Sequence, residues 1–207
     1  MIGIQNKSNT VWKNRFKLIL LWMVPFGLMI LATVTFNLVQ SGQLSVGSKN
    51  QGYLIQPPIQ LSKLALTSDK GSDNIWLGKW TMVVRGGAAC DQRCLDHLLL
   101  SRQIHIRLNK EANRTQRVYL SDASALTQPL SDHLAAEHHY LTVAHSPAEA
   151  LAALDQAVLT AAESHQGQPQ FFLVDPEGWA MMVYTDQHDG AAVLKDLKYL
   201  LKYSAER

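Results

Sequence analysis

The feature that most constrains this chain is a stretch from Leu18 to Val39 that contains no charged side chain. At about 1.5 Å per residue, a helix over this stretch crosses the roughly 30 Å hydrocarbon core of a bilayer. Lysine and arginine residues precede the stretch, whereas the first cation after it is Lys49. Because positive charge is retained on the cytoplasmic side of a membrane, we predict a cytoplasmic N-terminus at residues 1–17 and a transmembrane helix at 18–39.

The residues after the apolar stretch are predicted to lie outside the cytoplasm. Residues 40–52 are small and polar, which is typical of a linker, and residues 53–207 are enough for one domain. A cleaved signal peptide is the alternative, but its apolar core is only about 7–15 residues long. No cysteine follows the stretch directly, which excludes a lipoprotein anchor. The formal net charge of +2 argues against a nucleic-acid binder.

Two cysteines, Cys90 and Cys94, are the only ones in the chain and stand where a strand changes into a helix. The apolar run around Val83 is typical of a buried strand, and Gly86-Gly87 permits a sharp turn after it. Residues four apart lie on one helix face, so the two sulfurs are predicted to point the same way. The N-terminus of a helix favours the thiolate, which attacks disulfides and binds soft metals.

A purely stabilising disulfide, or two buried cysteines that never react, are the alternatives to a chemical role for this pair. The predicted topology places both cysteines in an oxidising compartment. There a disulfide persists, and a free thiol pair requires a reductant.

From Trp80 onward the pattern alternates between strands and helices. We expect the cysteine helix to run to about Ala112, strands at 117–121 and 139–143 with a short helix between them, a helix from Ser146 through Glu163, a hairpin of strands at 170–174 and 179–184, and a last helix at 191–203. In that last helix, Asp196 is expected to face outward with the lysines. This order predicts an α/β domain with a mixed central sheet.

The element order, with a cysteine pair on the first helix, resembles the thioredoxin-like fold. The segment from Pro169 to Gly178 looks like the strand of that family that begins with a cis-proline, and the amphipathic C-terminal helix is in its expected place. The resemblance implies that Pro169 is a cis residue beside Cys90 and Cys94 in the active site. It also implies a thioredoxin-like domain preceded by one transmembrane helix.

The spacing C-x-x-x-C, together with one N-terminal membrane helix and the Asp-Pro-Glu-Gly hairpin, resembles the Sco family of copper chaperones for cytochrome c oxidase. Residues 75–120 and 168–204 look more closely like small membrane proteins of bacterial cytochrome oxidase assembly gene clusters, with Gly-Lys-Trp ahead of Cys-Asp-x-x-Cys. The resemblance implies a single-pass protein of the bacterial inner membrane with a periplasmic C-terminal domain. It also implies copper, as Cu(I), and cytochrome c oxidase subunits or other assembly factors as partners.

The histidine that completes the Sco copper site is replaced. Gly167 stands at its position, so Cys90, Cys94 and the nearby His165 form the predicted metal site, with His97 as the next candidate ligand. The remaining histidines, including His138, show no ligand spacing and are expected to be solvated. Zinc is disfavoured because two cysteines and scattered histidines make no closed set of four ligands.

Three functions are compatible with this sequence. The first is assistance in cytochrome c oxidase assembly, by Cu(I) handling or by thiol reduction. The second is general periplasmic thiol–disulfide exchange, in which Cys90 attacks and Cys94 resolves the mixed disulfide. The third is a non-enzymatic membrane-anchored scaffold with a structural disulfide.

Overall fold

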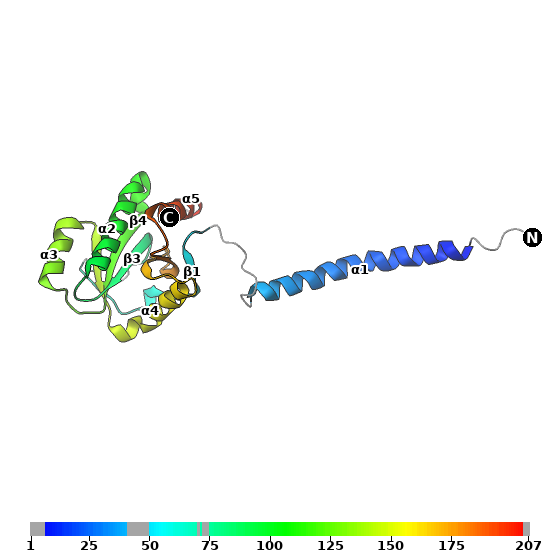
Figure 1. Ribbon diagram of the computed structural model, residues 1–207, viewed down its shortest axis with the longest axis horizontal. Coiled ribbons are helices and arrows are strands. Elements are labelled where there is room, and N and C mark those ends of the chain that lie inside the picture. Colours follow the sequence, from blue (N-terminus) through cyan, green and yellow to red (C-terminus); the bar gives the residue numbers. More distant parts are fainter. Residues whose placement is uncertain (1–6, 41–49, 70, 72–74, 205–207) are drawn as a thin grey trace, which may run out of the picture. The chain divides into compact units, whose positions relative to one another are not determined.

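The computed structural model describes residues 7–40, 50–69, 71 and 75–204 (Figure 1). The chain separates into two compact units, Met1–Lys49 and Asn50–Arg207. Residues 1–6, 41–49, 70, 72–74 and 205–207 lie outside the described residues, and they include most of the predicted linker at 40–52.

The first unit contains one long helix, α1 (Lys7–Gln40). Within it, Leu21–Leu38 is long and apolar enough to cross a membrane by length and composition. Three polar side chains of this segment bond back to the carbonyls of their own helix. Thr33 Oγ1 donates to Met29 O over 2.8 Å, and Asn37 Nδ2 donates to Thr33 O over 2.9 Å; Thr35 does the same to Leu31 O. Such bonds leave few polar atoms that require water, as lipid surroundings demand.

The second unit is built on a mixed sheet of seven strands in the order β1-β7-β6-β3-β4-β5-β2. The strands are β1 (Tyr53–Gln60), β2 (Thr67–Ser68), β3 (Trp80–Gly86), β4 (Thr115–Ser121), β5 (Leu141–His145), β6 (Pro169–Val174) and β7 (Trp179–Thr185). The central strands β3, β4 and β5 are parallel, and β6, β7 and β1 continue the sheet antiparallel. The predicted α/β domain with a mixed sheet is therefore confirmed.

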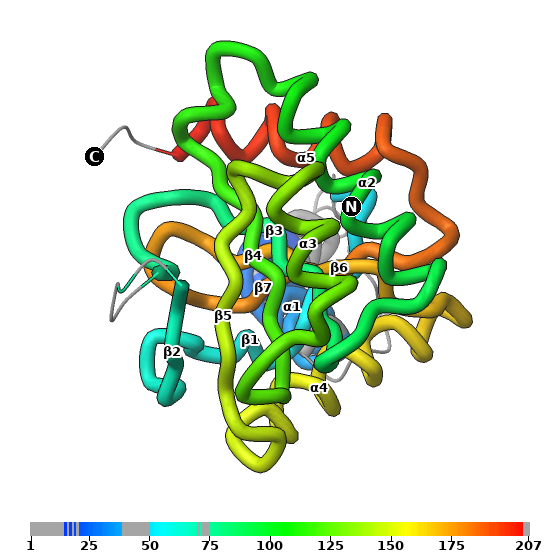
Figure 2. Tube along the Cα trace, turned by 90° about the vertical axis from the view of Figure 1, so that its left-hand side faces the viewer, coloured from blue at the N-terminus to red at the C-terminus, as the bar shows by residue number. Residues whose placement is uncertain are grey.

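Helices cover both faces of this sheet. They are α2 (Gln92–Arg107), α3 (Gln128–Glu137), α4 (Ala148–Glu163) and α5 (Gly190–Tyr203), with short 3₁₀ turns η1 (Leu61–Lys63) and η2 (Asn109–Arg114). Helices α2 and α5 pack side by side, and α4 lies on the opposite side of the domain (Figures 1 and 2).

Alternate side chains of each central strand enter two separate hydrophobic cores. In β3, Val83 packs into the core under α4, while Met82 and Val84 pack into the core under α2 and α5. In β4, Val118 and Tyr119 divide in the same way. Complete burial of one such aliphatic side chain stabilises the fold by about 1.5–3 kcal/mol, so the central strands contribute strongly to the free energy of folding.

Local boundaries differ from the predicted ones where tertiary pairing outweighs local pattern. A pair of prolines usually interrupts a strand, but β1 continues through Pro57-Pro58. It lies at the sheet edge and pairs only with β7, and a missing N–H is tolerated in an edge strand. Helix α2 ends at Arg107, and Asn109 then adopts a positive φ of 53°. The predicted strand at 139–143 begins two residues later, at Leu141.

His138, predicted to be solvated, is buried beneath α3 at the C-terminal end of that helix, with 4% of its surface exposed. Its Nδ1 lies 3.3 Å from Nη1 of Arg117, which is also buried. A guanidinium can only donate, so His138 accepts through Nδ1 and its ring is neutral. Burial, and then the charge of Arg117, lowers the pKa of His138 to about 4.

We therefore predict that the domain loses stability in mild acid. The unfolded chain binds a proton at His138 near pH 6.5, whereas the folded state binds it only near pH 4, so this contribution is complete above the first value and is lost as the pH falls toward the second. The expected loss is on the order of 2 kcal/mol. Denaturant titrations of the domain at several pH values measure the free energy of unfolding. In His138→Gln this free energy should depend less steeply on pH between about 4 and 6.5 than in the wild type. The matched change at the exposed His139 should retain the wild-type slope, and an unchanged slope in His138→Gln would contradict the assignment.

Candidate redox site

The turn that leads from β3 to the cysteines is held by contacts with β4. Gly86 has no room for a side chain, because an added Cβ would collide with the ring and hydroxyl of Tyr119. The Tyr119 hydroxyl donates to Gly87 O over 2.9 Å. Burial raises the pKa of Tyr119 to about 12, so the hydroxyl keeps its proton and remains a donor. Gly86 thus permits a close approach of the backbone to Tyr119, and this contact positions the start of the following helix.

Cys90 and Cys94 form a disulfide, with their Cα atoms 5.3 Å apart. The two sulfurs, which were predicted to point the same way, are bonded to one another. The geometry differs from the predicted one, because Cys90 lies in the loop before the helix and only Cys94 belongs to the first turn of α2. Asp91 is the N-cap, and its carboxylate accepts the Cys94 N–H over 2.9 Å. Both cysteines are half-buried and pack against the core under α2 and α5.

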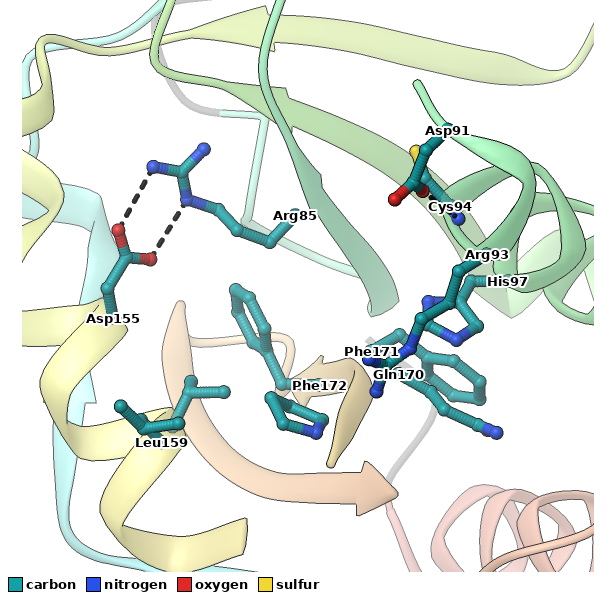
Figure 3. Close-up of a pocket in the computed structure, with 12 residues that line it drawn as sticks. Arg85, Asp91, Arg93, Cys94, His97, Asp155, Leu159, Gln170, Phe171 and Phe172 are labelled. Carbon is teal, nitrogen blue, oxygen red and sulfur yellow. Dashed lines mark hydrogen bonds and ion pairs between the residues drawn. The ribbon is translucent and has the colours of Figure 1, made fainter. Parts of the chain in front are cut away.

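A cleft of about 390 Å³ opens beside Cys94. It is lined by Arg85, Asp91, Arg93, Cys94, His97, Asp155, Val158, Leu159, Pro169, Gln170, Phe171 and Phe172. Figure 3 shows Arg85 and Asp155 at one end of the cleft and Asp91, Cys94 and His97 at the other. The predicted neighbours Cys94 and Pro169 therefore share one cavity, although they are far apart in the sequence.

Pro169 has a trans peptide bond, so the predicted cis bond is wrong. Within the described residues the one cis bond is Gln56–Pro57. At Pro169 the antiparallel ladder continues across the proline, which faces Thr185. The preceding Gln168 exchanges hydrogen bonds with Asp186, through Asp186 N to Gln168 O over 3.0 Å and Gln168 N to Asp186 Oδ1 over 2.9 Å. This extended pairing keeps the chain in the trans form, which X–Pro bonds favour in any case.

Arg85 is a fixed cation at the far end of the cleft. Its Nε and Nη2 donate to the two oxygens of Asp155 over 2.9 and 3.0 Å, and Nη2 also reaches Asp122 at 3.1 Å. Burial opposes the charged form, but the two carboxylates outweigh it and raise the pKa of Arg85. Its Nη1 donates to Gly86 O over 2.6 Å, so the same side chain ties the turn before the cysteines to α4. Arg85 was not among the predicted site residues, although a charged residue at the end of an apolar strand is a signal that the sequence contains.

His97 lies one turn after Cys94 and lines the same cleft. Burial, and then the charge of Arg93, lowers the pKa of His97. The imidazole is therefore neutral at pH 7 and can accept a proton or bind a metal.

His165 lies away from the lining of this cleft. Its ring stacks on Tyr53, with centroids 3.8 Å apart, and its Nδ1 is 2.9 Å from Ser164 Oγ. Gly167, at the position of the Sco histidine, packs so closely on Thr185 that an added Cβ would lie 2.6 Å from that side chain. Among the described residues, no three His, Cys, Asp or Glu side chains are gathered so as to hold a metal ion. A ligand role for His165 stays a prediction.

Residues 80–204 match the family described as transmembrane-like, thioredoxin-like, C-terminal domain, and the chain belongs to this family. Its structure is also similar to that of yeast Sco1 with copper bound, with a TM-score of 0.51, 17% identity, and coverage of 78% of this chain and 100% of that one. A second crystal structure of yeast Sco1 gives a TM-score of 0.50 and 18% identity, and the match covers 77% of this chain and 99% of that one.

A third structure, BsSco, is described as a member of the Sco family of cytochrome c oxidase assembly proteins. It gives a TM-score of 0.49 and 13% identity, and the match covers 77% of this chain and 100% of that one. No curated protein sequence matches the chain. At these identities the two yeast Sco1 structures, with TM-scores of 0.51 and 0.50, establish the fold alone, which is thioredoxin-like.

The N-cap at Asp91 yields a prediction that separates stability from redox chemistry. Asp91→Ala removes the acceptor for Cys94 N–H and should cost about 1 kcal/mol in the free energy of unfolding. It also removes a negative charge beside the thiolate of the reduced form, so the reduction potential of the pair should rise. The matched variant is Asp189→Ala, because Asp189 caps α5 through Ala192 N in the same way. It should lower stability similarly and leave the potential unchanged. Equal shifts in potential for both variants would contradict a direct effect of Asp91.

Proposed function

We propose that this protein is a membrane-tethered thiol–disulfide protein whose Cys90–Cys94 pair assists the assembly of cytochrome c oxidase, by thiol reduction or by Cu(I) handling. In this proposal residues 18–39 cross the bacterial inner membrane, residues 1–17 are cytoplasmic, and the linker 40–52 leads to a periplasmic domain at 53–207. The assignment to oxidase assembly rests on the sequence resemblance to Sco-like proteins of oxidase gene clusters.

The observation that carries the thiol function is a half-buried disulfide at the start of a helix and beside an open cleft. A purely structural bridge gains nothing from such a cleft, whereas a redox pair requires access for a second protein. The cleft combines apolar side chains around Pro169, namely Val158, Leu159, Phe171 and Phe172, with charged side chains at both ends, which suits a segment of a target polypeptide.

The proposed reaction transfers two electrons from the reduced pair to a target disulfide. The Cys90 thiolate attacks one target sulfur, forms a mixed disulfide and releases the other target sulfur as a thiolate. The Cys94 thiolate then attacks Cys90 and releases the second target thiolate, which leaves the Cys90–Cys94 disulfide. In this proposal His97, which lines the same cleft as Cys94, accepts the proton of the Cys94 thiol. A dithiol donor in the same compartment must restore the reduced pair.

The same two sulfurs fit Cu(I), because thiolates are soft ligands that suit this ion. A third ligand of the Sco type does not fit at Gly167, since its backbone packs directly on Thr185. We therefore treat Cu(I) as cargo that two thiolates hold. The candidates for a further ligand are His165, two residues before Gly167, and His97, three residues after Cys94.

We predict that the reduction potential of the pair lies above about −250 mV, whereas structural disulfides lie below about −300 mV. Equilibration of the domain with glutathione buffers measures this value. The double variant Cys90→Ser/Cys94→Ser should lose less than about 2 kcal/mol of stability, because the bridge closes a very short loop. A potential below about −300 mV together with a larger loss of stability would instead support the scaffold function.

Copper binding separates the two assembly roles. We expect the reduced domain to bind Cu(I) more tightly than Cu(II), which favours nitrogen-containing sites. Anaerobic titrations of wild type, His165→Ala and Cys90→Ser with both ions provide the comparison. Cys90→Ser should lose Cu(I), and any stable Cu(II) complex should depend on His165. Unchanged Cu(I) affinity in Cys90→Ser would remove copper from the proposal and leave thiol exchange. A stable Cu(II) complex that survives His165→Ala would exclude His165 as the ligand.

A further inference from the structure

The outward face of α5 carries basic and aromatic side chains and no acidic one. Its exposed members, called here the α5 face, are Lys195, Lys198, Tyr199, Lys202 and Tyr203. The one acidic residue within the helix is Asp196, which was predicted to face outward but is buried, with 3% of its surface exposed. The α5 face therefore presents three positive charges that its own helix does not neutralise.

Two tyrosines form the aromatic part of this face. Tyr199 and Tyr203 are 42% and 66% exposed, and their ring centroids lie 4.6 Å apart. The Nζ atom of Lys202 lies 5.4 Å from the Tyr203 centroid. Tyrosine combines an apolar ring with a polar tip, and lysine combines an apolar stem with a charged end, so both side chains suit the boundary between hydrocarbon and water.

Asp196 binds the first described residues of the domain to the same helix. Its Oδ2 accepts Gln51 N over 2.8 Å and Gly52 N over 2.9 Å. Helix positions three and seven apart lie on one side, so Asp196 shares its side of α5 with Tyr199 and Tyr203. Gln51 and Gly52, near the start of the domain, are therefore bound to the side of α5, called here the flank of α5, that carries the tyrosine pair.

Chain length limits how far this flank can lie from a membrane. Helix α1 ends at Gln40, and the connection to Gln51 can extend to at most about 40 Å. When α1 spans the bilayer, the flank of α5 therefore remains within that distance of the lipid surface. A surface held so close to lipid meets headgroups at a high effective concentration.

We propose that the α5 face docks on the surface of the membrane that anchors the chain, by binding anionic phospholipid headgroups. The three lysines contact the phosphates, and the two tyrosine rings enter the headgroup layer. Clustered lysines near an anionic surface add their attractions, and salt screens them. No residue of α5 lines the cleft beside Cys94, so docking leaves the disulfide accessible. The proposal depends on α1 spanning the membrane and not on the thiol function.

The test uses the full-length chain in nanodiscs of phosphatidylcholine alone or mixed with phosphatidylglycerol. Acetylation by a water-soluble reagent, read by mass spectrometry at each lysine, reports which side chains are covered. Lys195, Lys198 and Lys202 should react at least about threefold more slowly in the anionic discs, and about 1 M salt should abolish the difference. Lys63, exposed on η1, is the internal control and should react equally in both.

Two surface variants test the aromatic contribution. Tyr199→Ser/Tyr203→Ser should reduce the protection of the lysines, whereas Tyr140→Ser should not. Tyr140 is the matched control because it is 79% exposed and lies outside α5. Thiol exchange by Cys90 and Cys94 should be unchanged in all variants, which separates this proposal from the proposed function.

Three outcomes would overturn the proposal. Equal acetylation of the α5 lysines in both lipids would exclude headgroup binding. An equal decrease at Lys63 would show general shielding by the disc. Protection that depends on the number of chains per disc, and not on lipid charge, would assign the α5 face to a second copy of the chain.

Discussion

The central strand β3 is the element on which the site depends. It pairs with β4 on one side and β6 on the other, and its side chains enter both hydrophobic cores. Because two neighbouring strands and two hydrophobic cores hold β3 in place, the position and direction of the chain at Gly86 are fixed. Arg85 and Tyr119 then hold the turn, and the cysteines follow at a defined place. The position of the two sulfur atoms is thus determined by the packing of β3 and of the turn that precedes Cys90.

Much of this architecture is predictable from the sequence because it follows from periodic apolar patterns. The apolar stretch ending at Val39, the strand before Gly86 and the hairpin around Asp175 all carry strong local signals, and the structure shows elements there. What the sequence did not predict depends on partners distant in the chain. Asp196 is buried because it accepts two backbone N–H groups from Gln51 and Gly52, which no helical pattern can show.

The candidate site divides in the same way. Cys90 and Cys94 were found directly, since spacing and position are local properties. The opposite end of the cleft comes from α4, where Asp155 binds Arg85, and only the folded chain brings these charges together. Pro169 was correctly associated with Cys94, but its peptide isomer follows from the pairing of Gln168 with Asp186 and is not encoded nearby. The prediction that His138 is solvated was wrong because its partner, Arg117, lies 21 residues earlier in β4.

The disulfide joins two residues only four positions apart, one before and one within the first turn of α2, in a segment that the N-cap and the preceding glycine turn already hold. Reduction of such a short loop frees little chain, so we expect the reduced form to keep the backbone of the oxidised one. A partner protein that distinguishes them must do so at the two sulfur atoms, by their charge and nucleophilicity. The redox state would then be recognised by the chemistry of the two sulfur atoms and not by a change in conformation.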